Sequence, residues 1–127
     1  MHEMSIVNHL FLLIRQKMEK LYKKIYPVKK VKVKVGKMST VVPRALSFAF
    51  EVLSKNTEFE NTVFKIDYIP LTIECLDCHR KMELDEPFLF CRCCDSFNVE
   101  IITGRELEID SFEIQEDETN KGVENGN

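Results

Sequence analysis

Cys75-Leu-Asp-Cys78 and Cys91-Arg-Cys-Cys94 are two C-x-x-C pairs with twelve residues between them. Two residues between cysteines let one tight turn direct both sulfurs at a single ion. Two such turns supply the four thiolates of a closed tetrahedral site, and soft thiolates suit Zn²⁺. The pattern therefore predicts a structural Zn(II) site with Cys75, Cys78, Cys91 and Cys94 as ligands, in a segment too small to fold on its own core.

Two further residues of this segment leave alternatives open. The usual spacing favours Cys94 as the fourth ligand and Cys93 as a free thiol, but Cys91 paired with Cys93 is the alternative. His79 either replaces a thiolate or lies exposed beside the site, and the second interpretation is the simpler one. His79 and Asp95 directly follow the two pairs, where a left-handed backbone is common and where His and Asp tolerate it.

The residues before the zinc segment predict a helix followed by a strand. Apolar residues recur at i, i+3, i+4 and i+7 over residues 7–25, and Pro27 ends this helix. Leu12 and Leu13 widen its apolar face, so we expect it to pack on a sheet and a second helix. Residues 31–35 read Val-Lys-Val-Lys-Val, the period-two alternation of a half-buried strand.

A second helix and a second strand follow. Pro43 suits the first turn of a helix, with Ser39 or Thr40 nearby as its cap. Residues 45–53 are apolar nearly all round, so this helix should be well covered. Residues 63–69 then predict a strand that ends at a proline.

After the cysteines the pattern predicts two strands and a tail. Residues 99–103 and 106–114 should form a pair that turns at Gly104. The hydrophobic phase changes near Asp110, which indicates a bulge or a strand that leaves one sheet for another. From residue 116 the chain is acidic and polar, as in a disordered tail.

These elements predict an α+β fold: a small sheet with two helices on one face, plus a four-cysteine zinc-ribbon-like module. We expect one unit over residues 1–70 completed by a returning strand at 105–115, a zinc-binding unit at 71–104, and a disordered tail at 116–127.

The composition excludes several classes of protein. The 127 residues contain no apolar run near the ~20 residues that a membrane helix needs, so we expect no membrane partner. Five cysteines crowded together make a poor disulfide framework, and the N-terminus does not resemble a signal peptide, so the expected location is cytoplasmic. With no phosphate-binding loop, no nucleophile–base pair and no open zinc position, the chain is not expected to be an enzyme.

The N-terminus reads Met1-His2-Glu3. The imidazole and backbone amide of His2 and the α-amine of Met1 could together bind one metal, and Ni²⁺ accepts planar nitrogen and oxygen ligands of this kind. Glu3 could supply a further donor. The alternative is a histidine that stands near the start by chance, because so short a motif is only a hypothesis.

Several segments together resemble one known family. They are Met1–Ile6, Val31–Ser39, Val42–Leu53, Ile69-Pro-Leu before the first cysteine pair, and Gly104–Glu113 after the second. This combination resembles the HypA/HybF family of hydrogenase-maturation proteins, which are nickel metallochaperones, over residues 1 to about 115. The chain departs from the family pattern at Arg44, His79, Arg92, Cys93 and Asp95, but no ligand is lost.

The resemblance implies a nickel ligand at His2, with Glu3 and the Met1 amine close by, and zinc ligands at the four cysteines of the two pairs. It implies delivery of Ni(II) with a partner GTPase into the large subunit of nickel–iron hydrogenase. Some members also serve urease through its accessory proteins. A homodimeric state is left open.

The charge distribution suggests an alternative function. Residues 1–44 carry a net charge of +9 and residues 45–127 one of −12. The basic first part could bind nucleic acid phosphates beside a zinc ribbon, or the protein could be an adaptor. However, the lysines alternate with valines, as on any solvated strand face, and the zinc segment is acidic. Nucleic acid is therefore not the expected partner.

Overall fold

The computed structural model of the protein describes residues 3–115 and 123–125. Within these residues the elements are α1 (Glu3–Tyr22), β1 (Val28–Gly36), a short 3-10 helix (Lys37–Ser39), α2 (Pro43–Ser54), β2 (Val63–Ile69), β3 (Leu71–Cys75), β4 (Lys81–Leu84), β5 (Val99–Thr103), β6 (Leu107–Ile114) and β7 (Val123–Asn125). None of the described helices has the length and apolar character needed to cross a membrane.

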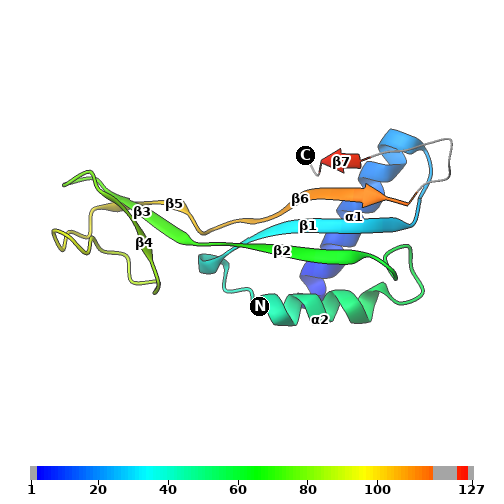
Figure 1. Ribbon diagram of the computed structural model, residues 1–127, viewed down its shortest axis with the longest axis horizontal. Coiled ribbons are helices and arrows are strands. Elements are labelled where there is room, and N and C mark those ends of the chain that lie inside the picture. The colour runs from blue at the N-terminus through cyan, green and yellow to red at the C-terminus, as the bar shows by residue number, and fades with distance from the viewer. Residues whose placement is uncertain (1–2, 116–122, 126–127) are drawn as a thin grey trace.

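The strands form two sheets at opposite ends of an elongated molecule (Figure 1). One sheet has four strands in the order β2-β1-β6-β7, with β1 parallel to β2 and antiparallel to β6. The other has the order β4-β3-β5, and β3 is antiparallel to both neighbours. The chain passes from the first sheet to the second after β2 and returns between β5 and β6.

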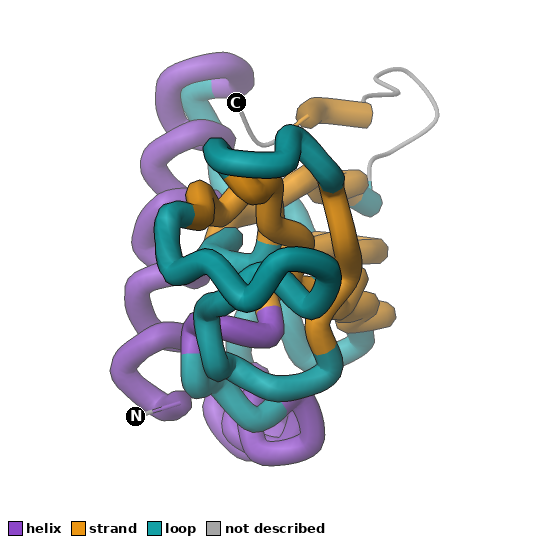
Figure 2. The backbone as a smooth tube through the Cα atoms, turned by 90° about the vertical axis from the view of Figure 1, so that its left-hand side faces the viewer, coloured by secondary structure: helices purple, strands orange, loops and turns teal. Residues whose placement is uncertain are grey.

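The main core lies between the four-stranded sheet and the two helices. The valines of β1 are buried and the lysines between them point away, as the alternation predicts. The helices lie to one side of the strands (Figure 2), and the sixteen buried residues of this core come from α1, β1, α2, β6 and the segments between them. Each fully buried aliphatic side chain contributes about 1.5–3 kcal/mol. The predicted α+β class, with two helices on one face of the sheet, is confirmed.

Aromatic rings tie the loop after α2 to the first helix. Phe11 stacks on Phe59 with ring centroids 4.0 Å apart, and Phe50 meets Phe11 edge-on at 5.2 Å. Arg15 covers Phe11 and Phe59 and donates two hydrogen bonds to the Glu58 carboxylate, at 2.6 and 2.9 Å. The hydrogen bonds from Arg15 hold the pKa of Glu58 below its usual range.

Two expectations about the first helix are wrong: where it ends, and how wide its buried face is. The helix ends at Tyr22, before Pro27, and Lys23 takes a left-handed backbone with φ 58°. The buried stripe is narrower than expected, because Leu12 and Leu13 are 50% and 40% exposed. One face of α1 fills the core, and the extra leucines remain at the surface.

The second helix is less covered than its composition predicts. Pro43 is its first residue, as expected, but the N-cap is Val42 and no side chain caps it. Ser39 instead donates a hydrogen bond of 2.7 Å to the Gly36 carbonyl and so closes the turn after β1. Phe48 is 62% exposed; among the described elements, the main neighbours of this helix are α1 and β2, which cover its other side.

The last strands differ most from the prediction. β5 and β6 do not pair with each other: β5 pairs with β3 and β6 pairs with β1, so Gly104 marks a change of sheet. The predicted bulge near Asp110 is confirmed, because the register moves from Lys32 opposite Ser111 to Val33 opposite Ile109. The bulge lets both halves of β6 direct apolar side chains to the core.

Within the expected disordered tail, the structure describes one short strand. β7, at residues 123–125, pairs antiparallel with β6 at Ser111–Glu113. The unpaired outer edge of β6 explains this, because a free strand edge accepts backbone hydrogen bonds from almost any extended segment. Residues 116–122 and 126–127 of the predicted tail lie outside the described residues.

Candidate metal centre

Four cysteine sulfurs converge at the end of the three-stranded sheet. Cys75 is the last residue of β3, Cys78 lies in the turn that follows, and Cys91 and Cys94 lie in the segment before β5. All four Sγ atoms lie within 4.8 Å of one another, with Cys75 to Cys94 and Cys78 to Cys91 both at 3.6 Å. A zinc ion with Zn–S bonds of ~2.3 Å needs sulfurs about 3.8 Å apart. The cluster therefore fits a tetrahedral Zn²⁺.

The two turns that carry the sulfurs share one geometry. In each, the residue after the pair donates its backbone N–H to the carbonyl of the first cysteine, from His79 to Cys75 and from Asp95 to Cys91, both at 2.9 Å. His79 and Asp95 have φ angles of 64° and 63°, the left-handed conformation predicted for them. Each second cysteine donates its N–H to the sulfur of the first at 3.4 Å. Both turns therefore direct their two sulfurs at one point.

Backbone hydrogen bonds favour the thiolate form of the first cysteine in each pair. The N–H groups of Cys94 and Cys93 lower the pKa of the Cys91 thiol to about 7. The N–H of Cys78 similarly lowers the pKa of Cys75. Because only deprotonated sulfur binds a metal, these hydrogen bonds prepare the ligands.

Cys93 and His79, the two alternative candidates for a zinc ligand, lie outside the four-sulfur cluster. The exposed Cys93 contributes its backbone N–H to the Cys91 sulfur at 3.3 Å, while its own thiol is not part of the four-sulfur group. His79 is exposed, and its side chain is likewise absent from that group. The geometry therefore favours Cys94 over Cys93 and His79 as the fourth ligand.

Arg92 lies inside the second cysteine pair, next to Cys91. Its guanidinium lies 3.7 Å from the centre of the Phe90 ring and donates to the carbonyls of Phe90 and Phe88, at 2.6 and 3.0 Å. These contacts fix the chain entering the second turn.

Asp77 joins the two turns, and the sequence did not reveal this role. The Ser96 hydroxyl and the Asn98 side-chain amide both donate to its carboxylate, the second at 3.1 Å. The hydrogen bond from Ser96 is the main cause of the lowered pKa of Asp77, with that from Asn98 second. The sequence signal for this role is an aspartate inside the first cysteine pair together with a serine and an asparagine shortly after the second pair.

Replacing Asp77 with alanine should loosen the metal centre without removing a ligand. We expect zinc affinity to fall by about tenfold, the lower end for residues that orient a metal site from outside. Transfer of zinc to a coloured chelator measures this. Asp85→Ala is the matched control, an exposed carboxylate of the same module, and an equal loss of zinc in both variants would contradict the role of Asp77.

The predicted N-terminal nickel ligands lie almost wholly outside the described residues. Met1 and His2 precede them, and Glu3, half-buried, is the first residue of α1. In the part of the chain that is described, the four cysteines are the only group of three or more metal-ligating side chains close enough to share an ion.

The outer face of the larger sheet carries mixed charge. The amines of Lys32 and Lys34 lie 3.8 and 3.6 Å from the Asp110 carboxylate, and Lys30 is in register with Glu113. A surface that binds nucleic acid presents positive charge that is not already paired. This face therefore does not favour the nucleic-acid alternative.

Comparison with known proteins identifies the family. Residues 1–114 match the family model described as "Hydrogenase/urease nickel incorporation, metallochaperone, hypA". The chain belongs to the HypA family. A hydrogenase maturation factor HypA of Nostoc sp. is 32% identical, over 91% of this chain and 97% of the relative. That of Moorella thermoacetica is 34% identical, over 89% and 98%.

Solved HypA structures share the fold. The solution structure of the Ni metallochaperone HypA from Helicobacter pylori has a TM-score of 0.62 at 25% identity, covering 92% of this chain and all of that one. A second HypA solution structure has a TM-score of 0.63 at 25% identity, over 90% and 96%. The identification from sequence is confirmed: the protein is a HypA-family nickel metallochaperone of hydrogenase maturation.

Proposed function

We propose that this HypA-family chain carries Ni²⁺ on its N-terminus and holds a structural Zn²⁺ between its two cysteine pairs. The observation that carries the proposal is the family match, which begins at residue 1 and runs through both cysteine pairs to the end of β6. Nickel is the cargo and zinc is the resident ion.

The nickel ligands in this proposal are the His2 imidazole, the His2 backbone amide and the Met1 α-amine. The start of a helix carries partial positive charge, which disfavours a nearby cation. Glu3 is in the first turn of α1, where its carboxylate offsets that charge and can serve as a further donor. Protonation of the imidazole and the amine competes with the metal, so acid should release nickel.

The zinc ligands in this proposal are Cys75, Cys78, Cys91 and Cys94. Four thiolates fill the coordination of the ion, so zinc has no open position for chemistry and its role is structural. We assign residues 71–104 to the zinc-binding unit, and residues 1–70 with 105–115 to the nickel-binding unit. On this assignment the protein acts by carrying metal, without catalysing a reaction.

The partners in this proposal are those of nickel delivery. They are a maturation GTPase, the large subunit of nickel–iron hydrogenase, and urease accessory proteins where urease is served. A cytoplasmic location agrees with a site that needs reduced thiolates, because oxidising compartments favour disulfides.

Nickel titration of His2→Ala beside the wild type tests the proposal. We expect the variant to bind Ni²⁺ at least about tenfold more weakly, a loss of about 1.4 kcal/mol, and to keep its zinc. His9→Ala is the matched control, because His9 is exposed on the surface of α1. Equal nickel affinity in the wild type and His2→Ala would reject the N-terminal site.

A further inference from the structure

Three phenylalanines lie at the surface of the zinc-binding unit, and the proposed function does not use them. Phe97 is 82% exposed and Phe88 is 60% exposed, while Phe90 is half-buried. The rings of Phe90 and Phe97 meet edge to face, with their centroids 6.1 Å apart. All three belong to the loops at the end of the molecule that lies away from the helices (Figure 1, Figure 2). We call these three residues the aromatic tip.

The backbone under the aromatic tip is fixed. The Cys91 N–H donates to the Ser96 carbonyl at 2.8 Å, and the Val99 N–H donates to the Phe97 carbonyl at 2.9 Å. An exposed ring on a fixed backbone loses little conformational freedom when a partner covers it, and such rings supply much of the binding energy of protein interfaces. The aromatic tip therefore has the character of an interaction surface.

The charge around the aromatic tip is negative. Residues 71–104 contain seven Asp and Glu against three Lys and Arg, a net charge of −4 with histidine neutral. In the part of the chain that the structure describes, the ion pairs lie outside this unit. Four thiolates around the proposed Zn²⁺ add two further negative charges. The field of the unit attracts cations and repels the phosphates of nucleic acid.

Arg92 shows which kind of cation these rings accept. Its guanidinium lies 3.7 Å from the centre of the Phe90 ring, whereas the other cation–ring pairs among the described residues lie at 5.1 to 5.7 Å. A planar, weakly hydrated guanidinium stacks on an aromatic face better than a compact ammonium does. Within the described residues no cation lies over Phe88 or Phe97, so both rings are open to a guanidinium from outside.

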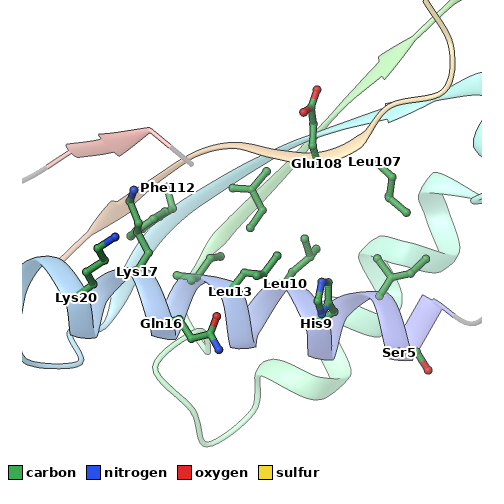
Figure 3. Close-up of a pocket in the computed structure, with 13 residues that line it drawn as sticks. Ser5, His9, Leu10, Leu13, Gln16, Lys17, Lys20, Leu107, Glu108 and Phe112 are labelled. Carbon is green, nitrogen blue, oxygen red and sulfur yellow. The ribbon is translucent and has the colours of Figure 1, made fainter. Parts of the chain in front are cut away.

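Another apolar surface carries positive charge at one end. It is a groove of about 750 Å³ between α1 and β6, where Lys17 and Lys20 lie at one end and Glu108 points away from the helix (Figure 3). The lysines disfavour a basic segment in this α1–β6 groove. A segment that carries arginine should therefore distinguish the aromatic tip from the groove.

We propose that the aromatic tip binds a segment of a partner protein that carries arginine next to apolar residues. A guanidinium stacks on Phe97, an apolar side chain covers Phe88, and the negative charge of the zinc-binding unit attracts the segment. Binding here uses neither the N-terminus nor the four cysteine thiolates, so it leaves both proposed metals in place.

Three short peptides test this proposal on the full zinc-loaded chain. One is an acetylated peptide amide with the sequence Gly-Arg-Arg-Leu-Leu-Gly, and the others have lysine or glutamate in place of both arginines. We expect the arginine peptide to shift amide NMR signals of residues 88–98. It should bind about threefold more tightly than the lysine peptide and about tenfold more tightly than the glutamate peptide. Absence of shifts, shifts confined to the α1–β6 groove, or equal binding of the arginine peptide and either other peptide would overturn the proposal.

Two exposed phenylalanines provide the matched variants. Phe97→Ala should weaken binding of the arginine peptide by about threefold to fivefold, the usual effect of a cation on an exposed ring. Phe48→Ala should leave binding unchanged, because Phe48 is 62% exposed on α2, outside the aromatic tip. If Phe97→Ala loses zinc, Phe88→Ala replaces it. Equal binding by the wild type and the tip variant would reject the tip. Concentration-dependent shifts of residues 88–98 without peptide would also overturn the proposal, because they would assign the tip to a second copy of the chain.

Discussion

Cys91→Ser should empty the zinc site and unfold β3, β4 and β5, while the larger sheet and both helices stay folded. The reason is the difference between the two cores. Among the described residues, the hydrophobic cluster of the three-stranded sheet has three buried members, Leu71, Ile73 and Leu84, against sixteen in the main core. So small a core does not stabilise a unit by itself, whereas structural zinc contributes about 10–16 kcal/mol of apparent binding free energy in zinc-finger peptides.

Metal analysis and amide NMR measure this result. We expect about one zinc per wild-type chain and far less in Cys91→Ser, with signals of residues 71–103 collapsing toward unfolded positions. Cys93→Ser is the matched control, since its thiol lies outside the cluster. Removal of zinc by a chelator should reproduce the Cys91→Ser spectrum. A fully zinc-loaded Cys91→Ser chain, or a zinc-free Cys93→Ser chain, would contradict the assignment.

The cysteine turns could be predicted in detail because their geometry is local. A C-x-x-C spacing and the residue after it determine one turn, so even the left-handed backbones of His79 and Asp95 followed from sequence. Asp77 could not be assigned in this way, because its partners Ser96 and Asn98 lie about twenty residues further along the chain. Only the folded arrangement of the two turns brings them together.

The strands show the same division between local pattern and long-range pairing. The alternation of residues 31–35 predicted β1, and the change of phase at Asp110 predicted the bulge in β6. β3 was missed, although Leu71, Ile73 and Cys75 alternate with half-buried residues. The cysteine-rich composition of the segment obscured a period-two pattern that was present.

Pairing of β5 with β6 was predicted from a turn signal and is wrong. A glycine between two strands also suits a place where the chain crosses from one sheet to another, and the sequence does not distinguish these cases. The exposure of Phe48 is a similar case, because an apolar helix surface can remain uncovered. What covers a surface depends on the whole fold and on partners, and neither can be read from a local pattern.

Gly36→Ala should strongly destabilise the place where the two sheets meet. Gly36 ends β1, and its N–H donates to the Glu106 carbonyl at 2.7 Å while Met38 donates to the Gly104 carbonyl at 2.8 Å. A Cβ on Gly36 would lie 2.1 Å from the Gly104 oxygen and 2.2 Å from its carbon. The φ angle of Gly36 is −80°, which suits any residue. Glycine is required here because the backbone of Gly104 comes so close.

Neither backbone can move aside cheaply, because Gly36 is the last residue of β1 and Gly104 is held by two hydrogen bonds of 2.8 Å, one accepted from the Met38 N–H and one donated to the Glu106 carboxylate. We therefore expect Gly36→Ala to lower the free energy of unfolding by about 3 kcal/mol or more, at the upper end for overpacking. Urea unfolding measures the loss, and amide NMR should locate the shifts at Gly36–Met38 and Gly104–Leu107. Lys29→Ala, an exposed change in the same strand, should stay within about 0.5 kcal/mol of wild type. A Gly36→Ala chain as stable as that control would show that the backbones can move apart to admit a side chain, and that the close contact between Gly36 and Gly104 is not what holds the two sheets together.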